Sequence, residues 1–328
     1  MHRATLGVMF LREYDPALIP TFARQVEAAG LDDLWIIEDA FYNGGLSGAA
    51  VALASTERIS IGIGIQPAVV RNAAYNTMDL ATLARIYPGR LQIGFGHGVA
   101  DWIRQVGEFP SSQVGALETI TLATRQLLRG ETVSFNTPDV YLDQVKLEYP
   151  PSVVPPVSLG VTGPKSLQMS GRAADGTILV ELTGPALVEE SRIRIADGQA
   201  EVNRTGEHHQ ITVFTHWMQG DDGPAVRSTW RQMVAERIAG GSMRQLVPAG
   251  FSGDAQRLLD EGGVANLAAR MPDAWLQEMT VSGTVADCLT QIDRLSAAGA
   301  HRIGLVPPIG TPLETITAWA TELNAARA

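Results

Sequence analysis

The sequence predicts an α/β fold, a (β/α)8 TIM barrel with insertions, and three observations support this class. Eight short apolar segments have the composition of buried strands, and most are separated by a segment with helical spacing of apolar residues. No linker rich in proline or serine divides the 328 residues. Parallel strand–helix–strand units with right-handed crossovers close into a barrel after eight repeats. A doubly wound open sheet is the competing architecture.

The predicted elements follow one another along the whole chain. The first strand is TLGVMFL (5–11), and the next helix has Leu18, Ile19, Phe22 and Val26 at helical spacing and ends at Gly30. The remaining strands are LWII (34–37), RISIGIGI (58–65), RLQIGFG (90–96), VSLGV (157–161), TILV (177–180), ITVFTHWM (211–218) and RIGLVP (302–307). Helices are expected over about 72–86 and 112–129. The polar, β-prone segment 131–149 and the mainly helical segment 219–284 are interpreted as insertions on one domain, 1–328.

Composition excludes several classes of protein. The net charge is −10 and no basic stripe interrupts it, so we expect no nucleic-acid partner. No apolar stretch is long enough for a membrane helix and no leader precedes the first strand, which predicts a cytoplasmic protein without a membrane partner. The single cysteine, Cys288, cannot form an internal disulfide. No set of histidine, cysteine and carboxylate residues has zinc spacing, so no metal is predicted.

In such barrels the chemistry lies where strands end. The positions concerned are Met9–Glu13, Glu38 and Asp39, Gly64–Pro67, Gly96–Gly98, Thr162–Ser166, Glu181–Gly184 and His216–Gln219. Acids such as Glu38 and Asp39 can bind ligand N–H groups or act as general acid or base, although capping is the simpler role, above all for Asp39. His97 stands between glycines, either as a catalyst or as a hydrogen-bonded loop residue.

The turn Thr162-Gly163-Pro164-Lys165-Ser166 opens a predicted helix. It combines a glycine that permits close approach, two hydroxyls and a lysine with free N–H groups at a helix start, which favours an anion. Pro164 suits the first helical turn. The alternative is an ordinary N-cap, in which Thr162 or Ser166 only satisfies backbone donors.

Four stretches of the chain resemble the bacterial luciferase-like superfamily. They are LWIIED, RISIGIGIQPAVVRNAAYNTMDLATLARIYPGRLQIGFGHG, VSLGVTGPKSLQMSGRAADGTILV and SGTVADCLTQIDRLSAAGAHRIGLVPPIG. Within the superfamily, the chain is most similar to coenzyme F420-dependent oxidoreductases of the methylenetetrahydromethanopterin reductase type. The likeness runs in the same order over nearly the whole chain.

This resemblance implies a flavin or deazaflavin at the carboxyl ends of the strands. It places a cis peptide bond that does not involve proline at Gly64-Ile65, behind the cofactor ring. Glu38 would contact the ring system, Gly98 would lie near the cofactor side chain, and Thr162–Ser166 would hold its phosphate. Relatives of this type are commonly dimers or tetramers, so a homodimer or homotetramer is expected.

The activity implied is hydride transfer between the deazaflavin C5 and a small organic substrate, with His97, or failing it Asp39, as proton donor. One alternative is an FMN-dependent monooxygenase that uses reduced flavin and O2, and another is a non-catalytic cofactor-binding barrel. Trp217 and Phe10 are candidates for pocket walls, although aromatic residues at strand ends are more often core.

The chain departs from the deazaflavin reductases at three positions. Met9 stands where they typically have an acid, Asp39 where histidine is usual and His97 where proline is common. We expect these departures to affect the substrate more than the cofactor scaffold.

Overall fold

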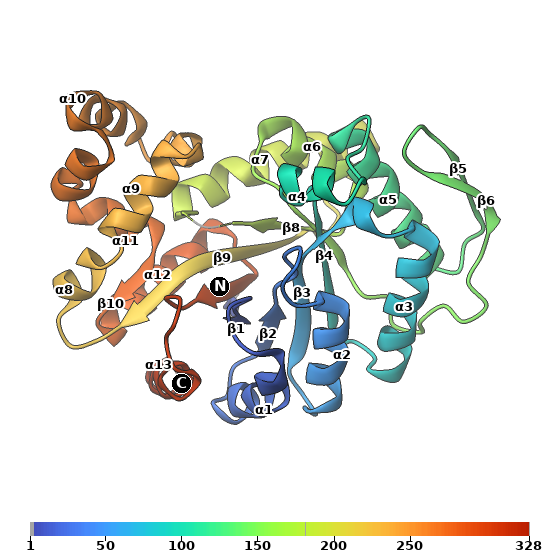
Figure 1. The fold of residues 1–328 in the computed structure, drawn as a ribbon, viewed down its shortest axis with the longest axis horizontal. Coiled ribbons are helices and arrows are strands. Elements are labelled where there is room, and N and C mark those ends of the chain that lie inside the picture. The colour runs from blue at the N-terminus through green and yellow to red at the C-terminus, as the bar shows by residue number, and fades with distance from the viewer. Residues whose placement is uncertain (1–2, 181, 328) are drawn as a thin grey trace.

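A closed barrel of eight parallel strands forms the centre of the protein (Figure 1). The computed structural model describes residues 3–180 and 182–327. Neighbouring strands pair in parallel, and the pairing of β8 with β9 closes the ring. The barrel strands are β1 (Thr5–Phe10), β2 (Asp33–Ile36), β3 (Ser60–Pro67), β4 (Leu91–Gly96), β7 (Val157–Gly160), β8 (Gly176–Leu179), β9 (Gln210–Gln219) and β11 (Arg302–Val306). All eight predicted strands and the predicted barrel are confirmed, and the open sheet is excluded.

Helices surround the barrel, as Figure 1 shows. They are η1 (Pro16–Leu18), α1 (Ile19–Ala28), α2 (Gly45–Ala54), η2 (Ala68–Val70), α3 (Ala73–Ile86), α4 (Ala100–Gln105), α5 (Gln113–Leu128), α6 (Pro164–Ala173), α7 (Pro185–Glu201), α12 (Val285–Ala298) and α13 (Leu313–Arg327). Local capping fixes several starts. The Asn72 side chain accepts from the backbone N–H of Ala74, and Thr284 and Asp287 form a capping box at α12. The helices expected over 72–86 and 112–129 are therefore confirmed as α3 and α5.

The strand glycines have a steric role inside the barrel. Trp35 and Phe214 lie there, with their ring centroids 5.0 Å apart in an edge-to-face arrangement. A Cβ added at Gly62 would overlap the Trp35 ring, and one at Gly64 would lie 2.7 Å from Phe214 Cζ. The alternation of glycine and isoleucine in β3 therefore makes room for two large rings, a reason that the sequence alone did not reveal.

The two segments outside the plain repeat form structures of their own. Segment 131–149 contains the antiparallel hairpin of β5 (Val133–Asn136) and β6 (Tyr141–Val145). Segment 219–284 holds α8 (Gly223–Ser228), α9 (Arg231–Ala239), η3 (Ser242–Leu246), α10 (Ser252–Arg270), α11 (Asp273–Met279) and β10 (Val281–Gly283). Most of its buried apolar side chains form a cluster separate from the main core. The short strand β10 was not expected, and it pairs with the end of β9, which extends to Gln219.

The described residues contain neither a membrane-spanning helix nor a metal-binding cluster. None of the helices in 3–180 and 182–327 combines the length and apolar character that crossing a membrane requires. Within the same ranges, no group of three or more histidine, cysteine or acidic side chains is arranged to hold a metal ion.

Candidate active site

Two adjoining cavities lie at the carboxyl ends of β2, β3 and β4. The first, about 300 Å³, is lined by Glu38, Asp39, Ile65, His97 and Gly98 and reaches the end of β7. The second, about 480 Å³, extends from it between the loop after β2 and helix α4. Both volumes fall in the range of small-molecule sites. The barrel thus brings these five predicted site residues together, whereas Gly64 and Thr162–Ser166 do not line either cavity.

The bulge in β3 forms the floor of the first cavity. The pairing of β3 with β4 shifts register between Ile63 and Gln66, and the Gly64-Ile65 peptide bond is cis. The predicted cis bond is therefore confirmed. A Cβ at Gly96 would lie 2.9 Å from Ile65 Cδ1, and one at Gly160 would overlap that atom. Glycine at both positions leaves the Ile65 side chain as an apolar surface beside the cavity, which suits the back of a planar ring.

Glu38 is buried, with 7% of its surface exposed, and both of its carboxylate oxygens have partners. Oε1 lies 2.5 Å from Arg71 Nη1, and Oε2 lies 3.1 Å from Arg71 Nη2. Oε2 also accepts from the Gly45 N–H, at 2.7 Å, in the first turn of α2. The carboxylate therefore joins the loop after β3 to the start of α2. Arg71 is a site residue that sequence reasoning missed, because no pattern pairs two residues so far apart in the chain.

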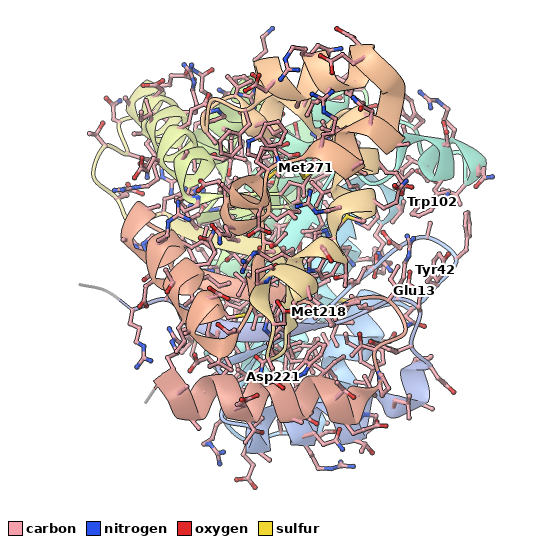
Figure 2. The ribbon with its side chains drawn as sticks, turned by 90° about the vertical axis from the view of Figure 1, so that its left-hand side faces the viewer. Glu13, Tyr42, Trp102, Met218, Asp221 and Met271 are labelled. Carbon is pink, nitrogen blue, oxygen red and sulfur yellow. The ribbon has the colours of Figure 1, made fainter. Side chains whose placement is uncertain are left out.

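Asp39 belongs to a group of charged and aromatic side chains at the rim. Arg12 Nη1 lies 2.6 Å from Asp39 Oδ2, and Arg12 Nε lies 3.0 Å from Glu13 Oε1. The guanidinium also lies over Tyr42, 4.7 Å from its ring centroid, and 5.7 Å from that of Trp102. Burial lowers the pKa of Arg12, but hydrogen bonds to the two acids raise it further, so the net shift is upward. Figure 2 shows Trp102, Tyr42 and Glu13 on one side of the molecule.

His97 follows β4 and is half-buried in the wall of the first cavity. Burial lowers the pKa of its imidazole, and a hydrogen bond to the Gln113 backbone offsets part of that shift. The Nδ1 atom is buried without a hydrogen-bond partner among the described residues. At neutral pH the ring is therefore uncharged and carries one proton, as a proton donor or acceptor requires.

The predicted phosphate loop lies at the start of α6, whose N-cap is Gly163. No side chain caps this helix, so its first N–H groups remain available. Lys165 is exposed, and neither its ammonium nor the Ser166 hydroxyl makes a hydrogen bond within the described part of the chain. The alternative of an N-cap by Thr162 or Ser166 is thus wrong for this helix, because its N-cap residue is a glycine.

Arg244 brings a second cation to this loop from η3. Its Nη1 donates to the Thr162 carbonyl at 2.5 Å, and its Nη2 lies 3.3 Å from Glu190 Oε1 on α7. Sequence reasoning missed Arg244, because it lies in a helical segment that carries no site motif. The position of this guanidinium depends on how that segment folds against the barrel.

Several other residues named from the sequence are not among those that line the two cavities. Trp217 and Phe10 are fully buried in the main core, so they are not pocket walls and the alternative of core residues is confirmed. Met9 is buried among the side chains inside the barrel. Glu181, at the end of the sixth predicted strand, lies outside the described residues.

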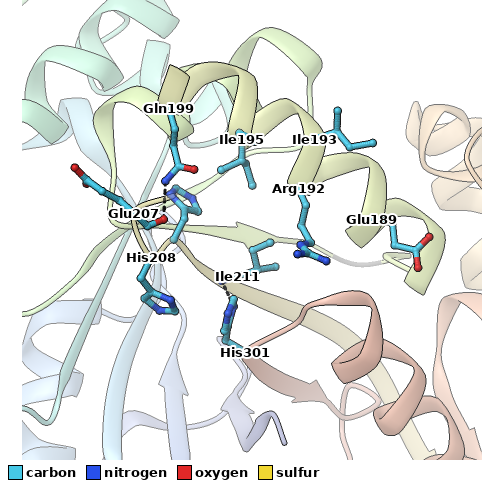
Figure 3. Close-up of a pocket in the computed structure, with 11 residues that line it drawn as sticks. Glu189, Arg192, Ile193, Ile195, Gln199, Glu207, His208, Ile211 and His301 are labelled. Carbon is cyan, nitrogen blue, oxygen red and sulfur yellow. Dashed lines mark hydrogen bonds between the residues drawn. The ribbon is translucent and has the colours of Figure 1, made fainter. Parts of the chain in front are cut away.

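A third cavity, of about 470 Å³, opens at the amino-terminal end of the barrel strands (Figure 3). Its lining includes His208, His209 and His301, and His301 Nδ1 accepts from the Ile211 N–H at 3.0 Å. His209 is buried and its Nε2 lies 2.8 Å from the Thr177 hydroxyl. This cavity is remote from the strand ends that carry the predicted site.

The fold and this arrangement of strand ends define a class of enzyme. The sequence model of the luciferase-like monooxygenase family matches residues 6–302, and the chain belongs to this family. The enzyme class and the resemblance read from the sequence are thereby confirmed.

Individual proteins similar to this chain have more specific names than the family. The chain is 26% identical over 314 residues to 5,10-methylenetetrahydromethanopterin reductase of Methanolobus tindarius, covering 93% of this chain and 95% of the relative. The coenzyme F420-dependent tetrahydromethanopterin reductase from Methanopyrus kandleri superposes with a TM-score of 0.81 at 19% identity, over 98% of both chains. An F420-dependent secondary alcohol dehydrogenase in complex with an F420–acetone adduct gives a TM-score of 0.76 at 19% identity, over 99% of both chains. The two structures confirm the fold.

Proposed function

We propose that this protein is an F420-dependent oxidoreductase that transfers a hydride between the deazaflavin and a small organic substrate. One observation carries the proposal: Ile65, in the bulge of β3, borders a cavity of about 300 Å³ at the carboxyl end of the barrel. The apolar Ile65 side chain lies against this cavity, as support of a ring from behind requires. The relatives whose names include coenzyme F420 direct the choice of ring.

When bound, the deazaflavin would supply the hydride-exchanging carbon, and the protein would supply position, electrostatics and exclusion of water. Ile65 would support the ring, and Gly98, which has a positive φ of 70°, would let the loop after β4 approach the cofactor side chain. The first turn of α6 with Thr162, Lys165 and Ser166 would hold a phosphate. Glu38 would act mainly by holding the loop after β3 against α2.

His97 is the proposed proton donor or acceptor. Its neutral imidazole lines the same cavity as Ile65, so it faces the space in which the reacting carbon of a substrate would meet the ring. Asp39 lines that cavity too, but its carboxylate is bound by Arg12 at 2.6 Å and is less available. His97→Asn should retain cofactor binding and slow turnover.

Fluorescence titration tests the cofactor directly. F420 fluorescence should be quenched on binding, and Lys165→Ala should weaken binding about tenfold by removing a charge from the phosphate. Lys146→Ala is the matched control, because Lys146 is exposed beside the β5–β6 hairpin. Competition with FMN decides between cofactors, and tighter binding of FMN would favour the monooxygenase. Turnover under anaerobic conditions would exclude a non-catalytic barrel.

A further inference from the structure

The second cavity, of about 480 Å³, has a predominantly apolar wall. Val70, Ile103 and Val106 line it together with Phe41, which is 68% exposed. The Phe41 ring meets Trp102 edge to face, with centroids 6.5 Å apart. Exposed apolar side chains gathered around a cavity indicate a ligand with apolar surface.

The backbone of Phe41 supports the same interpretation. Its φ is 72°, in the left-handed region that bulky residues rarely adopt. Such conformations persist where surrounding structure imposes them, and they are concentrated at ligand clamps. Here the unusual backbone directs an aromatic side chain to the cavity instead of into the core.

The charges around this cavity do not favour an anion. Three carboxylates line it, those of Glu38, Asp39 and Glu108, against one guanidinium, that of Arg71. Arg71 already binds Glu38 through two nitrogens. Arg12, at the rim, is bound to Asp39. Glu108 is exposed, and its carboxylate makes no hydrogen bond within the described residues.

We infer that the second cavity is the substrate site and that it selects uncharged, partly aromatic or branched aliphatic carbonyl compounds or alcohols over anionic ones. The inference rests on the proposed function, which supplies the redox chemistry. An anionic substrate would need an arginine or lysine free to pair with it, and both guanidiniums here are paired with protein carboxylates. An uncharged substrate would bury its apolar part against Phe41 and Val106 while its carbonyl or hydroxyl carbon faced the adjoining first cavity.

A matched pair of ketones tests this selectivity. Acetophenone and 4-acetylbenzoate share a skeleton and differ by one carboxylate, and their binding is measured by calorimetry with protein alone and with F420-loaded protein. We expect acetophenone to bind about tenfold more tightly, because the like charges oppose the benzoate. Glu108→Lys should improve 4-acetylbenzoate binding about fivefold and leave acetophenone unchanged. Glu131→Lys, an exposed residue outside both cavities, controls for net charge.

The outcomes separate this inference from the proposed function. Preference for 4-acetylbenzoate, or no binding of acetophenone up to its solubility limit, would overturn the inference even if F420 binds. Preference for acetophenone without any F420 binding would support the uncharged site and reject the F420-dependent reaction. Val106→Ser should weaken acetophenone binding about fivefold by removing apolar contact. An unchanged affinity would contradict the assignment of the second cavity as the substrate site.

Discussion

Replacing Glu38 with alanine should loosen the first turn of α2. The substitution leaves the Gly45 N–H, which now donates to Glu38 at 2.7 Å, without an acceptor in a buried position. An unsatisfied buried donor costs about 1–3 kcal/mol. Arg71 also loses its partner, but its side chain is 34% exposed, so water replaces much of that interaction. We therefore expect a loss of about 2 kcal/mol in the free energy of local opening.

Hydrogen–deuterium exchange of the amides in 45–49 measures this change. A loss of about 2 kcal/mol accelerates exchange about thirtyfold where the exchange rate follows the opening equilibrium. Glu38→Gln should produce a smaller increase, because its amide oxygen can still accept from Gly45. Glu13→Gln is the control, since the pair with Arg12 leaves the two side chains 32% and 29% exposed. If exchange is unchanged in Glu38→Ala but F420 affinity is lost, the reasoning is refuted. The Glu38 carboxylate would then act by binding the ligand and not by holding the first turn of α2.

Three further predictions concern other parts of the barrel. Gly160→Ala should push the Ile65 side chain toward the cavity and weaken F420 binding about tenfold. Adding Ile65→Val should restore F420 affinity, and failure of this rescue would contradict the steric argument. Burial lowers the pKa of His209 to about 3. As the pH falls, the unfolded chain therefore takes up a proton on this histidine before the folded protein does. Urea unfolding should show the free energy of unfolding decreasing by about 1.4 kcal/mol per pH unit from about pH 6.5 toward pH 3. His209→Asn should remove that slope, and an unchanged slope would refute it. Arg244→Met should free Thr162 and weaken F420 binding about fivefold, with an unchanged dissociation constant as the contrary result.

The barrel was predictable because each strand carries its own signal. A run such as RLQIGFG is apolar, short and followed by a turn, and burial on both faces requires that composition. The parallel order then places all the strand ends together, so Glu38, Asp39, Ile65 and His97 could be expected at one site without knowledge of any distance. The cis bond at Gly64-Ile65 came from the family likeness and not from the residues themselves.

The partners of these residues could not be predicted, because ion pairs join segments that have no fixed separation in sequence. Glu38 meets Arg71 after a bulge and a 3-10 turn, and Thr162 meets Arg244 from 82 residues away in the chain. Aromatic positions misled for a related reason. Trp217 lies next to the end of the predicted strand 211–218, but β9 continues to Gln219. The Trp217 ring packs against Trp319 of α13 on the outside of the barrel.

The contact between Arg244 and Thr162 links the proposed phosphate site to the stability of a segment that has its own hydrophobic cluster. An anion bound at the start of α6 would favour the state in which this arginine contacts Thr162. By thermodynamic linkage, the bound anion would stabilise the folded state of α9, η3 and α10 against opening. Gly262 and Gly263 interrupt α10 with non-helical backbone, which makes that helix the natural place for a protease to enter when the segment opens. Limited proteolysis near this break would then report phosphate occupancy at the start of α6, without any cofactor chemistry.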